Sequence, residues 1–254
     1  MYANLRSQGR RASIPISYGE SEDLQDRLFA AICYTHRGKK GFLPKGQLAG
    51  LVHEESVTQE LTRCLSATHS LRAIQNYARQ ACYDSTPQTT EDEQNSPRNK
   101  SFRNVFAILV LIEKSATIDR FLNEGVSDAD LPLVMVKRLK KSWQYDLCRK
   151  DALDQPLECF RRWTRMAIMN FEEWQWTMLA PFLTKGERKN VKHYVLQDQA
   201  ILPFTDDSRR HDNAHQAEEL GGGFGRVFRA EIHPDHHDFN DPVVRLSPVC
   251  FTNA

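Results

Sequence analysis

An unbroken apolar run in the middle of the chain sets the strongest constraint on the fold. The segment FRNVFAILVLIEK, residues 102–114, has no polar side chain between positions 105 and 112. A helix with no polar face has to be surrounded by other parts of the chain, so we expect a buried helix here. Periodicity alone also allows a buried strand. The run is far shorter than the roughly 18 to 20 residues that a membrane span requires, and we expect no membrane partner.

Composition and charge exclude several classes of protein. The 254 residues are 40% hydrophobic and 26% charged, with a formal net charge of +1. Such a chain can form one large or two small globular domains, and it has no general attraction for nucleic acid. Its six cysteines are scattered without a C-x-x-C pair, and no apolar stretch follows the basic N-terminus. We therefore expect an intracellular, cytoplasmic protein in a reducing compartment.

Helical periodicity and capping residues extend through most of the chain before residue 203. The expected helices run from a Ser21 cap to Gly38, over 48–65 after breaks at Pro44 and Gly46, over Leu71–Cys82, over 116–125 with Gly125 as its end, and over 157–181. Residues 127–133 read as a capped turn interrupted by Pro132. The sequence pattern changes at 191–204, VKHYVLQDQAILPF, where apolar and polar residues partly alternate and predict a strand.

These segments predict a mainly α fold in which a helical N-terminal domain precedes a short β segment. The expected organisation is a disordered arm at 1–19, a helical domain at 20–202, a linker at 203–219 and the β segment at 220–254. Within the helical domain, residues 84–101 lack large apolar side chains and predict a flexible loop.

The expected helix over 157–181 has two interpretations. Its aromatic residues, Trp163 and Trp174 among them, recur at three and four residues, which favours core packing over a groove for a protein partner. A partner bound through the helical domain stays open as the alternative. The arginines Arg161, Arg162 and Arg165 read as a solvated face, because no aromatic residues are clearly interleaved on it.

A glycine-rich stretch near the C-terminus, EELGGGFGRVFRAEIHPDHH at 218–237, carries the main functional hypothesis. A dinucleotide-binding loop would precede a helix, whereas RVFRAEI favours a strand. A phosphate loop of the G-x-x-x-x-G-K-[ST] kind would place a lysine after the last glycine, and Arg226 stands there. The remaining pattern is the G-x-G-x-x-G-x-V loop of protein kinases, a hairpin that folds over ATP.

The candidate cofactor-binding residues follow from that pattern. In the kinase register, Gly222 and Gly225 are loop glycines, Phe224 is the tip and Val227 lies beneath the adenine. Leu220 falls at the first glycine position, so either Gly221 serves there with a one-residue shortening or the phosphate contact is weakened. The candidate site consists of Gly221, Gly222, Gly223, Phe224, Gly225 and Val227.

The stretch GGFGRVFRAEIHPDHHDFN, together with upstream segments such as FLPKGQLAGLVHEESVTQELTRCL and VKHYVLQDQAILPF, resembles a family of filamentous-fungal kinase-like proteins. The resemblance covers about residues 20–240. It implies a helical region ahead of a Ser/Thr-type kinase domain, with ATP and Mg²⁺ as cofactors of a full-length parent. This chain then looks truncated just after the glycine-rich loop.

The resemblance also implies an inactive polypeptide. A kinase needs a lysine on its third strand, a catalytic-loop aspartate and a metal-binding aspartate, and none of these is found after the loop. Arg245 lies near the lysine position and is a poor substitute for a compact ammonium group. We expect no catalytic residue in this chain. The alternative is a non-catalytic helical interaction module with a vestigial glycine loop.

The histidines allow a weaker alternative, a zinc site. Their spacing is compatible with metal ligation, but the two groups stand on different kinds of segment without a neighbouring cysteine: His211 and His215, then His233, His236 and His237. We expect no metal site.

Overall fold

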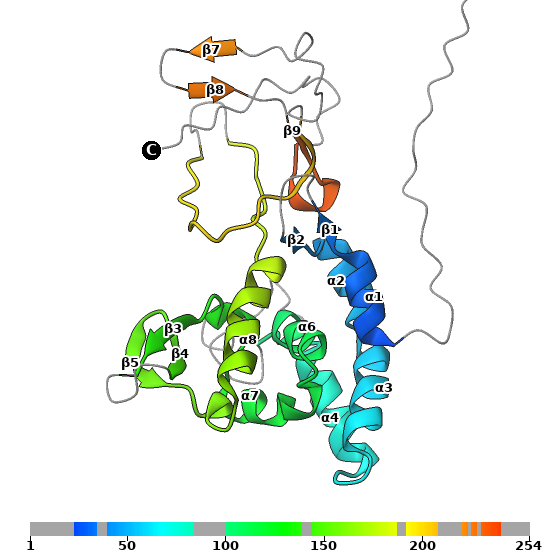
Figure 1. The fold of residues 1–254 in the computed structure, drawn as a ribbon. Coiled ribbons are helices and arrows are strands. Elements are labelled where there is room, and N and C mark those ends of the chain that lie inside the picture. Colours follow the sequence, from blue (N-terminus) through cyan, green and yellow to red (C-terminus); the bar gives the residue numbers. More distant parts are fainter. Residues whose placement is uncertain are drawn as a thin grey trace, which may run out of the picture.

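The computed structural model describes residues 23–34, 40–83, 100–138, 144–186, 192–207, 220–222, 225–227 and 230–239 (Figure 1). The architecture is mainly α, as expected, with short strands between and after the helices. The arm expected at 1–19 lies outside the described residues, as does the loop expected at 84–101 except for its last two residues.

The described part of the chain contains α-helices, short 3-10 helices and short strands. The α-helices are α1 (Leu24–Ala31), α2 (Lys45–Leu51), α3 (Glu54–Leu65), α4 (Leu71–Ala81), α6 (Arg103–Leu111), α7 (Ile118–Glu124) and α8 (Arg165–Met178). Short 3-10 helices are η2 (Ser115–Thr117), η3 (Asp128–Asp130), η4 (Glu158–Phe160) and η6 (Pro234–His236). None of the helices in the described part of the chain has the length and apolar character needed to cross a bilayer.

Helix α6 lies at the centre of the helical part and confirms the buried helix expected there. From Val105 to Leu111 no side chain is more than 5% exposed. Helices α1, α2 and α8 contact it (Figure 1). Each fully buried Val, Leu, Ile or Phe side chain stabilises the fold by about 1.5 to 3 kcal/mol, so this helix supplies much of the core.

Both ends of α6 are satisfied by side chains from distant parts of the chain. Asp128 accepts hydrogen bonds from the backbone N–H of Asn104 at 3.1 Å and of Val105 at 3.0 Å. Burial raises the pKa of Asp128, and these hydrogen bonds oppose the rise. At the other end, the amide of Gln25 on α1 donates to the carbonyls of Val110 and Leu111, both at 3.2 Å. Buried backbone groups need such partners, so the caps fix α1 and η3 against α6.

The first helix is shorter than predicted at both ends. Asp23, rather than Ser21, caps it by accepting a hydrogen bond from the Gln25 N–H at 2.8 Å. The helix ends at Ala31 instead of Gly38, because the following residues leave the helical conformation and strand β1 (Cys33–Tyr34) pairs with β2 (Gly41–Phe42). Gly38 lies outside the described residues.

The next helices agree with the predictions in part, because the helix expected over 48–65 is two helices, α2 and α3, separated at Val52 and His53. Pro44 stands immediately before α2, as expected for a break, while Gly46 lies inside that helix. Helix α4 runs over Leu71–Ala81 with Ser70 as its cap. Helix α7 ends at Gly125, whose φ of 67° is the left-handed conformation that favours glycine.

A three-stranded antiparallel sheet between α7 and α8 was not predicted. Strand β4 (Tyr145–Arg149) lies between β3 (Val134–Lys137) and β5 (Ala152–Pro156). The buried amide of Gln175 on α8 ties the sheet to the helices, since it accepts from the Leu133 N–H at 2.8 Å and donates to the Leu133 carbonyl at 3.0 Å. The part of the chain before residue 203 is therefore not purely helical.

Helix α8 begins at Arg165, later than predicted, because Thr164 caps it by accepting a hydrogen bond from the Ala167 N–H at 3.2 Å.

An aromatic cluster lies around the start of α8. Trp163 lies 4.8 Å from Phe160 and 6.0 Å from Phe171 and Phe121, measured between ring centroids. Trp174 is half-buried and packs on the ring of Phe29 at 5.5 Å. Both tryptophans pack against the core.

The strand predicted over 191–204 is wrong. The described residues 192–203 have no regular structure, and strand β6 begins only at Phe204. Val195 is 99% exposed, and all of residues 192–199 are exposed, so this part of the segment has no buried face. A turn closed by the Ala200 N–H and the Gln197 carbonyl at 2.9 Å interrupts the segment.

We predict that Gly41→Ala destabilises the fold. A Cβ at this position would lie 2.7 Å from the Cys33 carbonyl oxygen and would also overlap the Ile32 side chain. Overpacking of this kind costs about 1 to 3 kcal/mol of unfolding free energy, measurable by urea denaturation. Gly50→Ala is the matched control, because nothing lies within 4 Å of that Cβ, and it should be neutral or stabilising. Equal effects of the two substitutions would contradict the prediction.

We also predict that Trp163→Ala lowers the unfolding free energy by about 3 kcal/mol, because it removes the indole from the aromatic cluster. Met166, one turn along and 62% exposed, provides the control. Met166→Ala should change stability by less than about 0.5 kcal/mol in the same urea titration. A Trp163→Ala variant of wild-type stability would instead assign the indole to a docking face.

Candidate functional site

The glycine stretch forms an antiparallel hairpin. Strand β7 (Leu220–Gly222) pairs with β8 (Gly225–Val227), and the register sets Leu220 opposite Val227, Gly221 opposite Arg226 and Gly222 opposite Gly225. The two residues that connect the strands, Gly223 and Phe224, lie outside the described residues. The last residue pair before the turn is therefore Gly222 with Gly225, and two residues connect the strands.

A second strand pair lies outside the first in the chain. Strand β6 (Phe204–Asp207) pairs with β9 (Ala230–Ile232), with Phe204 opposite Ile232. The two pairs are nested, since β6 and β9 flank β7 and β8 in sequence (Figure 1). The linker expected at 203–219 therefore begins with a paired strand.

The stretch that follows β9 fastens these strands to the helical part. We call residues His233–Phe239 the clip. Its backbone meets the segment after α8, where the Leu183 N–H donates to the His236 carbonyl at 2.7 Å and the Asp238 N–H donates to the Leu183 carbonyl at 3.3 Å. The Asp235 carboxylate accepts a hydrogen bond from the Gly46 N–H of α2 at 3.1 Å. Three distant parts of the sequence converge here.

Gly46 permits this close approach. A Cβ on Gly46 would lie 2.5 Å from the Asp235 carboxylate oxygen. The glycine that was expected to break a helix therefore has a different role, because it lets a carboxylate reach the backbone of α2.

The histidines of the clip pack against aromatic and backbone groups. His236 is 1% exposed, and its Nδ1 lies 3.1 Å from the Pro181 carbonyl oxygen. The Phe42 ring, also buried, lies 5.8 Å from the His233 ring and 5.3 Å from the His236 ring in edge-on contacts. Burial lowers the pKa of both histidines.

No group of three or more His, Cys, Asp or Glu residues suited to a metal ion occurs in the described part of the chain. His211 and His215 lie outside it, as does Arg245. The packing contacts give His233 and His236 a structural role that the sequence did not indicate, because the partners of the clip lie far away in the chain.

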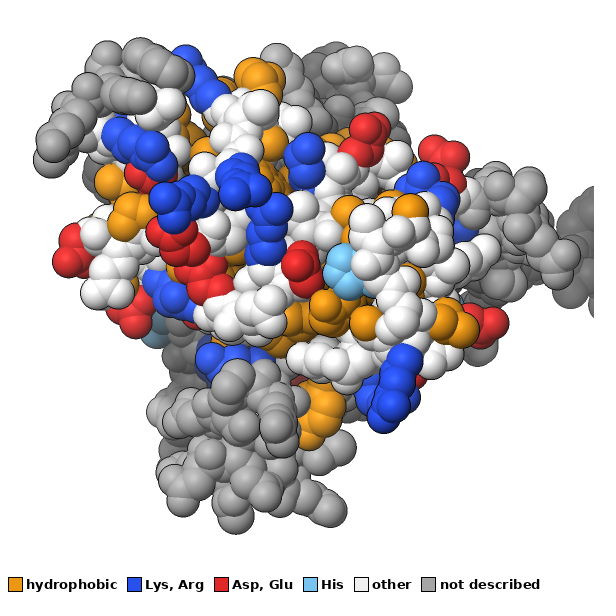
Figure 2. All heavy atoms as spheres, turned by 90° about the horizontal axis from the view of Figure 1, so that it is seen from below, with side chains coloured by type: hydrophobic (Ala, Val, Ile, Leu, Met, Phe, Trp, Pro, Cys, Tyr) orange, Lys and Arg blue, Asp and Glu red, His pale blue; other side chains and the backbone are white. Residues whose placement is uncertain are grey.

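Basic side chains gather on one end of the helical part, where α8 begins, and carboxylates are interspersed among them (Figure 2). Two of the arginines in this region have partners: Arg161 pairs with Glu158 at 3.2 Å, and the Arg165 guanidinium lies 5.4 Å from the centre of the Tyr145 ring. Trp163 turns toward the core instead of this surface. The mixture of charges is that of a solvated face.

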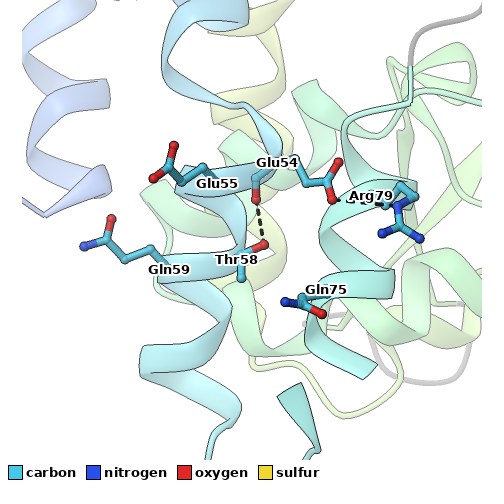
Figure 3. Close-up of a pocket in the computed structure, with 6 residues that line it drawn as sticks. All are labelled: Glu54, Glu55, Thr58, Gln59, Gln75 and Arg79. Carbon is cyan, nitrogen blue, oxygen red and sulfur yellow. Dashed lines mark hydrogen bonds and ion pairs between the residues drawn. The ribbon is translucent and has the colours of Figure 1, made fainter. Parts of the chain in front are cut away.

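A shallow polar hollow lies between α3 and α4, at residues that the sequence did not single out (Figure 3). Its volume is about 720 Å³, and its lining residues are Glu54, Glu55, Thr58, Gln59, Gln75 and Arg79. The Arg79 guanidinium pairs with Glu54 at 3.7 Å, and the Thr58 hydroxyl donates to the Glu54 carbonyl at 2.7 Å. The Thr58 hydroxyl therefore donates to a backbone carbonyl and not to a side chain that could act as a general base. In Figure 1, α3 and α4 lie at the opposite end from β7 and β8.

Comparison of the chain with models of protein families, with curated proteins and with solved structures finds no match.

Proposed function

We propose that this chain is a helical region that carries the opening hairpin of a protein-kinase N-lobe. In a full-length parent, the backbone of Gly221, Gly222, Gly223 and Gly225 would lie over the phosphates of ATP with its Mg²⁺, and Val227 would lie beneath the adenine. The observation that carries the proposal is the register of β7 and β8, which brings Gly222 opposite Gly225 next to the Gly223–Phe224 connection.

The position of Gly221 favours a ligand over a purely structural explanation. A two-residue hairpin connection accounts for glycines at the turn itself, because such turns need residues with positive φ. Gly221 lies one pair further back, opposite Arg226, where turn geometry has no need of a glycine. In an interior strand position glycine weakens the pairing and marks a place where another group approaches the backbone. A phosphate is such a group.

The clip supports a scaffold role for the helical region. A two-stranded hairpin is marginally stable by itself. Here the clip follows β9 directly and bonds to α2 and to the segment around Leu183. The helical region would thus hold the base of the glycine hairpin.

A non-catalytic interaction module is the second candidate. Trp163 and Trp174 give little support to this candidate as docking residues, since both pack against the core. Its support is the exposure of Met166 and Met169, which are 62% and 36% exposed and three residues apart on α8. A protein partner would bind at this face of the helical domain.

We expect the chain alone to have no phosphotransferase activity. No lysine follows Lys192 in the sequence, and no H-R-D or D-F-G pattern is present. Positioning and charge stabilisation account for nearly all of kinase catalysis, so the hairpin alone cannot supply it. Radiolabelled ATP with Mg²⁺ and a basic protein substrate should give no transfer above that of a heat-denatured sample. Metal-dependent turnover by the pure chain would overturn this part of the proposal.

A loop graft tests whether the hairpin can function over ATP. Residues 220–227 replace the glycine-rich loop of an active Ser/Thr kinase, and the KM for ATP is measured. We expect turnover with a KM raised about tenfold, equivalent to about 1.4 kcal/mol of lost phosphate contact, because Leu220 stands at the first glycine position. The same graft with Leu220→Gly should recover most of that loss.

The matched control is a graft that carries Gly222→Val and Gly225→Val, in which side chains block the approach to the phosphates. It should lose most of its turnover while the kinase stays folded, as judged by circular dichroism. If the Leu220→Gly graft is folded and works no better than this control, the kinase-loop proposal fails.

A further inference from the structure

We propose that the clip is a pH-sensitive latch, in which protonation of His236 in mildly acidic solution releases the C-terminal strands from the helical part. The helical part stays folded when the latch opens. This inference is independent of the kinase-loop proposal, because it depends on the contacts of the clip and not on what the glycine hairpin binds.

The surroundings of His236 accept the neutral imidazole and disfavour the charged one. The Nδ1–H donates to the Pro181 carbonyl at 3.1 Å, which leaves Nε2 without a proton. Nε2 is buried and has no hydrogen-bond partner in the described part of the chain. A proton added there would create a buried N–H without an acceptor together with a buried charge, and both raise the free energy of the closed latch.

The charged groups around the ring do not compensate for that cost. Lys45 of α2 and His233 both disfavour a positive charge on His236, and only Asp235 favours it. The Asp235 carboxylate already accepts the Gly46 N–H and also faces the Cys33 thiol of β1. His237 adds a further repulsion on His233. Burial is the largest cause of the lowered pKa of His236. The hydrogen bond to Pro181 opposes it by raising the pKa, and the repulsion from Lys45 lowers the pKa further.

Within the described residues, backbone hydrogen bonds, the Asp235–Gly46 contact and the ring contacts of His233 and His236 hold the latch closed. The backbone bonds at Leu183 and Asp238 are joined by a bond from the Lys185 N–H to the Asp238 carboxylate at 2.6 Å. Phe42 is 0% exposed yet lies outside the main hydrophobic cluster, so the two histidine rings provide part of its cover. The clip lies outside the main hydrophobic cluster, so it can open locally while the core around α6 stays folded.

The direction of the pH effect follows from the lowered pKa. A histidine that is neutral in the closed state and titrates near 6.5 when released takes up more protons on release. The closed latch therefore keeps its full stability above about pH 6.5 and loses it as the pH falls from there toward the lower pKa of the buried ring. Within that window the ratio of closed to open molecules falls by up to about tenfold per pH unit for one histidine.

Amide hydrogen exchange on the full chain tests the latch. Protection factors, corrected for intrinsic exchange, are measured by NMR between pH 7.5 and 5.0 for the amides of Leu183, Lys185 and Asp238. We expect them to fall up to about tenfold per pH unit below pH 6.5. The Phe106 amide, bonded to the Phe102 carbonyl at 2.7 Å in the core, should keep its protection.

Two variants assign the effect to His236. His236→Phe keeps an aromatic ring against Phe42 but cannot be protonated, so the pH dependence of protection at Leu183 should shrink to the part that His233, whose pKa is also lowered, contributes. His193→Gln removes an exposed histidine and should leave the wild-type pH dependence unchanged. Unaltered pH dependence in His236→Phe, or pH-independent protection in the wild type, overturns the proposal.

The NMR titration of the His236 ring in the wild type gives a test that does not depend on any variant folding. A pKa below 6.5 for the ring supports the latch. A pKa at or above 6.5 overturns it, because the closed state would then bind the proton as readily as the released chain.

Discussion

The burial of α6 is the constraint on which the helical part depends. A helix whose side chains are apolar all round can exist in water only if other elements enclose it, and its unpaired backbone groups then need partners inside the protein. Asp128 supplies them at one end and Gln25 at the other. The first helix and the turn after α7 are therefore held in place by hydrogen bonds to the backbone of α6 as well as by hydrophobic contact.

The elements that the sequence predicted well are those whose signals are local. The apolar run of α6 and the glycine after α7 each act within one or two helical turns. The sheet β3–β4–β5 escaped prediction because its strands are short and partly exposed, so their side chains do not alternate between buried and exposed positions. The strand predicted over 191–204 was wrong because its sequence partly alternates between apolar and polar residues, whereas the described residues 192–203 pair with no strand.

The candidate site shows the same division. A turn and a following strand were predictable from the glycines and from Val227, and β7 and β8 have that arrangement. The docking of the IHPDHH stretch was not predictable, because Asp235 meets Gly46 and His236 meets Pro181 across long separations in sequence. Histidine spacing alone suggested metal ligation, whereas burial against Phe42 gives these rings a packing role.

The nesting of the two strand pairs has a consequence for how this region can vary. The segment 208–219 enters the first arm of the hairpin between β6 and β7, while β8 and β9 on the return arm are separated only by residues 228 and 229. An insertion between β6 and β7 would lengthen a connection, and the entropy cost of closing a connection grows only slowly, by about 0.6 kcal/mol for each doubling of its length. Related chains could therefore differ greatly in length at this point and still keep the same glycine register and the same docking of the return arm.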